Sequence, residues 1–272
     1  MKLIFFDIDG TLIGEHREMP GSAAQAIKRA RENGNLCLVN TGRTASIVLD
    51  WLPKLAPFDG YLCGCGTQIL FQGKELLHKT FTMEECLDIM KGLEENRIDA
   101  ILEGVGNDYH NDLDKMFTVT FRNYILEHYA DRNWESYREA PGNFDKFYCF
   151  ADDSAGVYRF MENRGYLDLI DREKGFFEIV PKGYSKATCM DRLLEYLRET
   201  GQYGSELSLA DTVAIGDSPN DIPMLEHAGI AIAMGNSAQS VLEMADFVTA
   251  GVFEDGIEKA LDWLGVLNFS EK

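Results

Sequence analysis

KLIFFDIDGTL, residues 2–12, runs from a short apolar segment into two aspartates and a glycine turn. Its β-branched and aromatic side chains predict a buried strand that ends at the turn. Asp7 and Asp9 follow that strand, at the carboxyl end where open α/β sheets bind ligands. Burying two carboxylates is costly unless a cation or a proton shares the site. A solvated turn acid before a glycine would explain one aspartate, but it explains the pair poorly.

Short apolar strands alternate with amphipathic helices at both ends of the chain, which is typical of a parallel sheet covered by helices on both faces. We therefore expect an α/β fold with a Rossmann-like parallel-sheet core domain. Further strands are expected at 36–39, 60–63, 212–217, 230–234 and 246–250, and helices at 22–33, 44–52, 219–228 and 237–245.

The middle of the chain has a different pattern, in which helical stretches are interleaved with aromatic-rich strand candidates. We expect an inserted, smaller α+β cap domain with a largely antiparallel sheet over 81–182, and a core domain formed by 1–80 and 183–272. The expected helices of the insert are 83–96, 115–130 and 153–163, and its expected strands are 98–103, 146–151 and 176–180.

The charge balance is strongly acidic, because 26 Lys and Arg face 45 Asp and Glu, a formal net charge of −19. Such a surface repels phosphate backbones and anionic lipid, so neither nucleic acid nor a membrane is an expected partner. The amino terminus lacks the features of a signal peptide. The six cysteines follow no metal or redox spacing, and we expect buried reduced thiols in a cytoplasmic protein.

A second acidic turn, AIGDSPND at 214–221, repeats the arrangement of a strand, an aspartate and a turn. Asp221 alone would be interpreted as an acid at a helix N-terminus. Such a structural explanation fits Asp217 less well, because Asp217 follows its strand in the same way that Asp7 follows the first strand. If the two strands are neighbours, three or four carboxylates converge, which is a site for a hard divalent cation such as Mg²⁺.

Two further segments carry groups suited to a phosphate. VNTGRTAS at 39–46 places Thr41, Gly42 and Arg43 after a strand, where a hydroxyl and backbone N–H groups can hold phosphate oxygens. A Thr N-cap and a surface Arg would explain this segment equally well. Lys186 begins the helix after the insert, and a lysine there opposes the helix dipole unless an anion offsets it.

Taken together, these segments resemble the haloacid dehalogenase-like superfamily, specifically its Cof-type (subfamily IIB) phosphatases, which have a C2-type cap inserted after the second motif. The resemblance covers the whole chain, since the insert has the position and approximate length of that cap. The matching segments, in order, are FFDIDGTL (5–12), NTGR (40–43), Lys186 in GYSKA, and GDSPNDIPML (216–225).

The resemblance implies an Mg²⁺-dependent phosphatase with an aspartyl-phosphate intermediate. Asp7 would be the nucleophile, and Asp9 would protonate the leaving alcohol and later activate water. The implied metal ligands are the carboxylates of Asp7 and Asp217 and the backbone carbonyl of Asp9. Asn220 and Asp221 would orient metal-bound water or Lys186, and the phosphoryl oxygens would be held by Thr41, Gly42 and Lys186.

The cap would close over the site and contact the part of the substrate beyond the phosphate. Candidate specificity residues are Arg43, Asn107, Tyr109, His110 and Glu178. A histidine in a polar loop, such as His110, is more often a solvated surface residue than a ligand, and a strand-edge charge is the alternative interpretation of Glu178. One position departs from the family pattern, because Cys65 in GYLCGCGTQIL (60–70) stands where an Asn is expected.

We expect a cytoplasmic phosphatase that acts on a small phosphorylated metabolite, with a sugar phosphate implied by the resemblance. One alternative is a phosphotransferase or phosphomutase that uses the same intermediate. Another is a non-catalytic protein that binds a phosphometabolite, although such a binder would have no reason to retain Asp9. The sequence indicates no oligomeric state.

Overall fold

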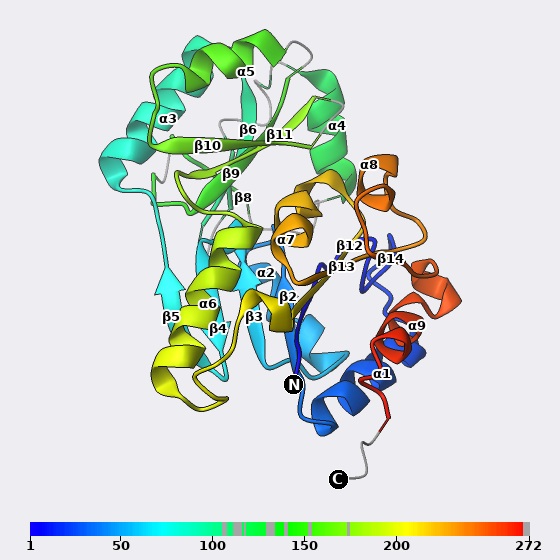
Figure 1. The fold of residues 1–272 in the computed structure, drawn as a ribbon. Helices are drawn as coiled ribbons and strands as arrows, with labels where there is room; N and C mark the ends of the chain where they lie inside the picture. The colour runs from blue at the N-terminus through cyan, green and yellow to red at the C-terminus, as the bar shows by residue number, and fades with distance from the viewer. Residues whose placement is uncertain are drawn as a thin grey trace. The chain divides into compact units, whose positions relative to one another are not determined.

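The computed structural model describes residues 1–104, 108–110, 116, 118–128, 134–138, 141–151, 154–172 and 175–268. They divide into two compact units, Met1–Leu77 with Ser185–Lys272, and His78–Tyr184. The first unit, here called the core unit, is therefore built from both ends of the chain, and the second is the insert (Figure 1). The sequence had suggested domain boundaries after residue 80 and before residue 183.

The core unit contains an eight-stranded sheet with the order β14-β13-β12-β1-β2-β3-β4-β5. From β14 to β3 all neighbouring strands are parallel, and β4 then pairs antiparallel with β3. The strands are β1 (Leu3–Phe6), β2 (Leu36–Asn40), β3 (Gly60–Cys63), β4 (Gln68–Phe71), β5 (Lys74–His78), β12 (Thr212–Gly216), β13 (Ile230–Ala233) and β14 (Phe247–Val248). The parallel strands were predicted, whereas β4 and β5 were not.

Helices cover both faces of this sheet. On one face, Ile4 and Phe6 of β1 pack with α1 (Gly21–Glu32) and α9 (Gly256–Trp263). On the other, Leu3 and Phe5 pack with α6 (Lys186–Thr200), α7 (Ile222–His227) and α8 (Gln239–Leu242). Successive strand residues point to opposite faces. All four residues of β1 are therefore buried, which explains its uninterrupted apolar sequence.

Three predicted helices of the core unit are shorter than expected. The helix predicted at 44–52 is only α2 (Ala45–Val48), followed by a 3₁₀ turn at Leu52–Lys54. Pro53 lies in the first turn of that 3₁₀ segment, where its missing N–H costs no helical hydrogen bond. The helix predicted at 219–228 begins as a 3₁₀ turn, Pro219–Asp221, before α7. The one predicted at 237–245 is reduced to α8.

The insert has a six-stranded sheet with the order β10-β11-β9-β6-β7-β8, antiparallel except between β7 and β8. One face packs against α3 and α5, and α4 covers part of the other. The elements are α3 (Met83–Glu95), β6 (Asp99–Glu103), β7 (Asp108–His110), α4 (Val119–His128), β8 (Trp134–Ser136), β9 (Lys146–Phe150), α5 (Ser154–Met161), β10 (Leu167–Asp171) and β11 (Phe176–Pro181).

The predicted fold class, an α/β core with an inserted α+β domain, is confirmed. In the insert, β7, β8 and β10 were not predicted. All six cysteines are buried free thiols. Among the described residues, none of the helices has the length and apolar character needed to cross a membrane.

Candidate active site

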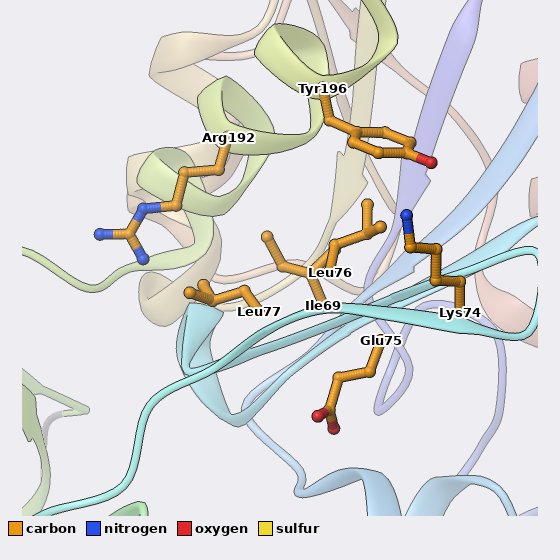
Figure 2. Close-up of a pocket in the computed structure, with 7 residues that line it drawn as sticks. All are labelled: Ile69, Lys74, Glu75, Leu76, Leu77, Arg192 and Tyr196. Atoms are coloured by element: carbon orange, nitrogen blue, oxygen red, sulfur yellow. The ribbon is translucent and has the colours of Figure 1, made fainter. Parts of the chain in front are cut away.

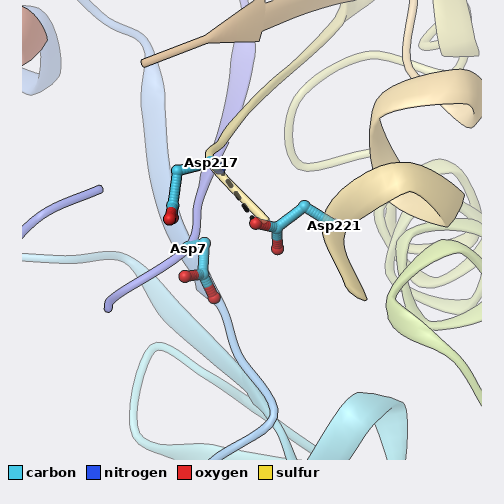
Figure 3. A group of neighbouring side chains, drawn as sticks. All are labelled: Asp7, Asp217 and Asp221. Atoms are coloured by element: carbon cyan, nitrogen blue, oxygen red, sulfur yellow. Dashed lines mark hydrogen bonds between the residues drawn. The ribbon is translucent and has the colours of Figure 1, made fainter. Parts of the chain in front are cut away.

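The parallel pairing of β1 with β12 brings the two acidic turns together. Phe6 lies opposite Ile215, so the aspartates that follow these strands emerge at the same edge of the sheet. The backbone N–H of Asp7 donates to the carbonyl of Ile215 at 3.0 Å. One carboxylate oxygen from each of Asp7, Asp217 and Asp221 lies within 4.8 Å of the other two (Figure 3). These three aspartates are called the acidic cluster below.

Lys186 completes the cluster from a third part of the chain. Its side chain is 1% exposed, and Nζ donates to Oδ1 of Asp7 at 2.5 Å and to Oδ1 of Asp221 at 2.6 Å. Lys186 is the first residue of α6, whose start is fixed by a capping box between Ser185 and Thr188. Asn40, at the end of β2, donates from Nδ2 to the Lys186 carbonyl at 2.8 Å.

The carboxylate of Asp221 accepts hydrogen bonds on both of its oxygens. Its Oδ2 accepts from the backbone N–H of Asp217 at 3.0 Å and from that of Ser218 at 3.1 Å, while its Oδ1 accepts from Lys186. A Cβ on Gly216 would come within 2.7 Å of the Asp221 Cβ, so only glycine leaves room for this arrangement. Asn220 is buried beside it and accepts a hydrogen bond from the Ser218 hydroxyl.

The site carries more negative charge than Lys186 balances. Burial, and then the charge of Asp221, raise the pKa of Asp7 well above its usual value. The same two causes raise the pKa of Asp217 to about 7. Burial acts to lower the pKa of Lys186, but Asp221 and Asp7 outweigh it and raise that pKa. Mutual repulsion among the carboxylates therefore favours uptake of a positive charge.

The donor set fits a hard divalent cation. Oδ1 of Asp217 accepts from the Thr11 hydroxyl at 2.9 Å. Within the described part of the chain, Oδ2 of Asp7 and Oδ2 of Asp217 accept no hydrogen bond from the protein. Oxygen ligands of this kind are those that Mg²⁺ and Ca²⁺ prefer. Gly10, with φ 81°, lies against the carboxylate of Asp217. A Cβ at Gly10 would be 2.3 Å from Oδ2 of that carboxylate.

Asp9 lies at the exposed side of the site, where Arg43 holds it. The guanidinium donates from Nε to Oδ2 and from Nη2 to Oδ1, both at 2.6 Å, although the Asp9 side chain is 50% exposed. Thr41 is buried, and its hydroxyl accepts from the backbone N–H of Arg43 at 3.1 Å. Because α2 starts at Ala45, Gly42 and Arg43 lie in the loop that precedes this helix.

The structure thus brings together Asp7, Lys186, Asp217 and Asp221, and pairs Asp9 with Arg43. Two contributors were not predicted, namely Thr11, which holds Asp217, and Asn40, which anchors the start of α6. Each had a weak signal in the sequence, because Thr11 follows the Asp9-Gly10 turn and Asn40 is a polar residue at the end of an apolar strand.

The candidate specificity residues of the insert are described within their own unit. Asn107 lies outside the described residues. Tyr109 is buried in the core of the insert with its ring 5.6 Å from that of Tyr137, and His110 is half-buried. Glu178 accepts from Nζ of Lys146 at 2.5 Å and lies on β11, between β10 and β9, so it is not a strand-edge charge. Their roles in specificity stay predictions.

A separate cavity of about 400 Å³ lies within the core unit between the β4–β5 pair and α6 (Figure 2). Its walls include Ile69, Leu76, Leu77 and Tyr196, with Lys74 and Arg192. The Lys74 ammonium lies 5.3 Å from the Tyr196 ring centroid, so at least one of these cations already has a partner. None of the predicted site residues lines this cavity.

Comparison with known proteins identifies the family of this chain. The family model described as haloacid dehalogenase-like hydrolase matches residues 4–261. The chain belongs to this family. The chain is 25% identical to a Bacillus subtilis protein named 5-amino-6-(5-phospho-D-ribitylamino)uracil phosphatase. The match covers 96% of this chain and 94% of that protein.

Solved structures agree with the family match. A phosphatase of the haloalkanoate (HAD) enzyme superfamily from Bacteroides thetaiotaomicron is 26% identical, with a TM-score of 0.82 over 98% of this chain and 96% of that one. A HAD subclass IIB sugar phosphatase is 25% identical, with a TM-score of 0.78 over 98% of this chain and 100% of that one. The prediction of a phosphatase from this family is confirmed.

We expect added Mg²⁺ to stabilise the protein against heat, and to do so more at about pH 8 than at about pH 5.5. Protonation of Asp217, whose pKa is raised to about 7, competes with the cation. Without metal, the raised pKa of Asp217 means that the native state binds more protons than the unfolded chain at pH values between the two pKa values of this group. The free energy of unfolding therefore falls as the pH rises from the pKa in the unfolded chain to the pKa in the folded protein. At a hundredfold excess over Kd, Mg²⁺ adds about 2.7 kcal/mol.

Differential scanning fluorimetry with Mg²⁺ or with a chelator measures this shift. Asp217→Asn should lose most of it at the higher pH. Glu206→Gln, which removes an exposed carboxylate of the core unit, should keep it. An unchanged Mg²⁺ shift in Asp217→Asn would mean that the ion binds elsewhere.

Proposed function

We propose that this protein is a cytoplasmic Mg²⁺-dependent phosphatase that hydrolyses a small sugar phosphate through an aspartyl-phosphate on Asp7. The observation that carries the proposal is the placement of Asp7, which is buried at a strand end between a lysine and a second strand-end aspartate. The buried reduced cysteines support a cytoplasmic location.

In the proposed reaction, a carboxylate oxygen of Asp7 attacks phosphorus and forms an acyl phosphate as the P–O bond to the alcohol breaks. Both partners are anionic, so attack requires positive charge at the phosphoryl group. Lys186 supplies one such charge, since its ammonium already contacts Asp7 at 2.5 Å. Asp221 keeps that ammonium in place through its own bond of 2.6 Å.

Asp7 and Asp217, together with the backbone carbonyl of Asp9, would hold Mg²⁺. When bound, the ion supplies Lewis-acid charge that stabilises the transferring phosphoryl group. Asn220 and Asp221 would orient the groups around it. The hydrogen bond from Thr11 to Asp217 fixes one oxygen of that carboxylate and leaves the other without a hydrogen bond from the described residues.

Asp9 would donate a proton to the leaving alcohol and then remove one from the water that hydrolyses the acyl phosphate. Its position two residues after Asp7 keeps it near the reacting atoms, and its exposure leaves it accessible to a substrate hydroxyl. Arg43 holds both oxygens of Asp9 and thereby sets the direction of the carboxylate. Thr41 and Gly42, with Lys186, would bind phosphoryl oxygens.

The sugar phosphate class is supported by the names of two similar proteins, a sugar phosphatase and a 5-amino-6-(5-phospho-D-ribitylamino)uracil phosphatase. Phosphate release from a panel of sugar phosphates, sugar-alcohol phosphates, nucleotides and pyridoxal phosphate, with Mg²⁺ or chelator, tests this class. Preferential capture of the phosphoryl group by an added sugar would instead favour a phosphotransferase. An aryl phosphate is added to the panel as a general substrate. If no phosphate is released from any of these compounds, a binding protein is favoured.

Asp7→Asn should reduce Mg²⁺-dependent phosphate release by roughly 10⁴-fold or more, because an amide cannot serve as the nucleophile. Steady-state phosphate release measures the loss. As a control, Asp191→Asn makes the same change at a half-exposed position of α6 and should leave turnover near that of the native protein. Appreciable hydrolysis by Asp7→Asn would overturn the assignment of the nucleophile.

Arg43→Lys should lower kcat by about 10- to 100-fold with little change in KM. A lysine keeps the charge but cannot hold both oxygens of Asp9, so only part of the general acid–base contribution survives. Initial-rate kinetics separate kcat from KM. A rise in KM with unchanged kcat would instead assign Arg43 to substrate binding, as the sequence suggested.

A further inference from the structure

The turn that follows β3 has an unusual backbone. Gly64, Cys65 and Gly66 all have positive φ, at 60°, 53° and 90°. Glycine adopts this left-handed conformation freely, and asparagine does so more readily than other residues, but cysteine is not favoured there. Cys65 is fully buried, so the surrounding structure holds it in this conformation.

One side of the turn contacts the loop that carries Thr41. The backbone N–H of Cys65 donates to the carbonyl of Thr41 at 3.0 Å, and that of Gly64 donates to the carbonyl of Arg43 at 2.8 Å. These two bonds bracket Gly42 and fix both ends of the proposed phosphate-binding loop. They require consecutive N–H groups to point at the loop, which the left-handed conformation of Gly64 and Cys65 provides.

The other side of the turn contacts the start of α6. A Cβ built on Gly66 would lie 2.4 Å from the carbonyl oxygen of Ser185 and 3.2 Å from the Cβ of Cys189, so the backbone of the turn packs directly on the N-cap of this helix. Lys186 is the next residue.

We propose that Cys65 is a positioning residue that, through its left-handed backbone, sets Thr41 and Lys186 at the separation needed to bind one phosphoryl group. The proposal rests on the proposed phosphatase function, in which both residues hold phosphoryl oxygens. It assigns the role to the backbone conformation at residue 65 and not to thiol chemistry. An asparagine, which tolerates this conformation, should therefore serve in place of the cysteine.

The test compares the same substitution at two buried cysteines of one segment. Cys65→Val introduces a β-branched residue where φ is positive, whereas Cys63→Val does so at the end of β3, where φ is −111° and such residues are favoured. We expect Cys65→Val to lower kcat at least tenfold with a smaller effect on KM. Cys63→Val and Cys65→Asn should stay within about threefold of the native protein.

A second measurement does not depend on turnover. Titration calorimetry with inorganic phosphate in the presence of Mg²⁺ should give weaker binding to Cys65→Val than to Cys63→Val. The Mg²⁺-induced rise in melting temperature should be largely retained in Cys65→Val, because Asp7 and Asp217, the proposed metal ligands, follow β1 and β12 and lie outside the turn. A general loss of structure would reduce both signals together, so the split identifies positioning.

Native kcat and native phosphate affinity in Cys65→Val would overturn the proposal, and so would a Cys65→Asn variant as impaired as Cys65→Val. If Cys65→Val fails to fold, Gly66→Ala tests the contact with Ser185, and unimpaired phosphate binding by that variant would overturn the proposal. A native protein that binds phosphate but releases none from any substrate would overturn the proposed function alone. The phosphate titration would then decide the role of Cys65.

Discussion

The rest of the site depends on one buried contact, the ammonium of Lys186 held between Asp7 and Asp221. In the chain, Lys186 is 179 positions from Asp7 and 35 positions from Asp221. The contact can therefore form only when both ends of the chain have assembled one sheet. Removing ions from water is expensive, and a buried pair stabilises a fold little compared with apolar packing. We infer that the contact serves the chemistry of Asp7 more than the stability of the core unit.

The sheet topology explains how such a contact is reached without strain in its strands. β1 and β12 are parallel neighbours, so their terminal aspartates meet at one edge, and α6 delivers Lys186 to the same edge after the chain returns from the insert. Space for the carboxylates comes from glycines, since a side chain on Gly10 or Gly216 would collide with Asp217 or Asp221. Backbone conformation and charge placement are therefore specified together.

Much of this arrangement could be predicted from the sequence, because its signals are local. A strand buried on both faces, such as Leu3–Phe6, is apolar throughout, and an aspartate at its end is conspicuous. The β4–β5 pair was missed because β5, at the sheet edge, is partly exposed and lacks that signal. The pairing of Arg43 with Asp9 could not be predicted, since it depends on how two loops from different strands approach each other.

The conformation of Cys65 marks a further limit of sequence reasoning. The sequence identified the residue as a departure from a family pattern. Only the structure shows its positive φ, in a turn between the two segments that we propose bind phosphate. A left-handed cysteine is tolerated when neighbouring contacts determine the backbone, and here hydrogen bonds to Thr41 and Arg43 do so.

The same physical effect accounts for both the cost and the use of the acidic cluster. Without a cation, burial and repulsion raise the pKa values of Asp7 and Asp217, which means that the ionised cluster is a high-energy arrangement. The packed sheet, the capped start of α6 and the glycine contacts prevent the carboxylates from moving apart. A divalent cation would relieve this repulsion. The rigidity that is unfavourable without the ion would then contribute to its binding free energy and fix the orientation of Asp7, the proposed nucleophile.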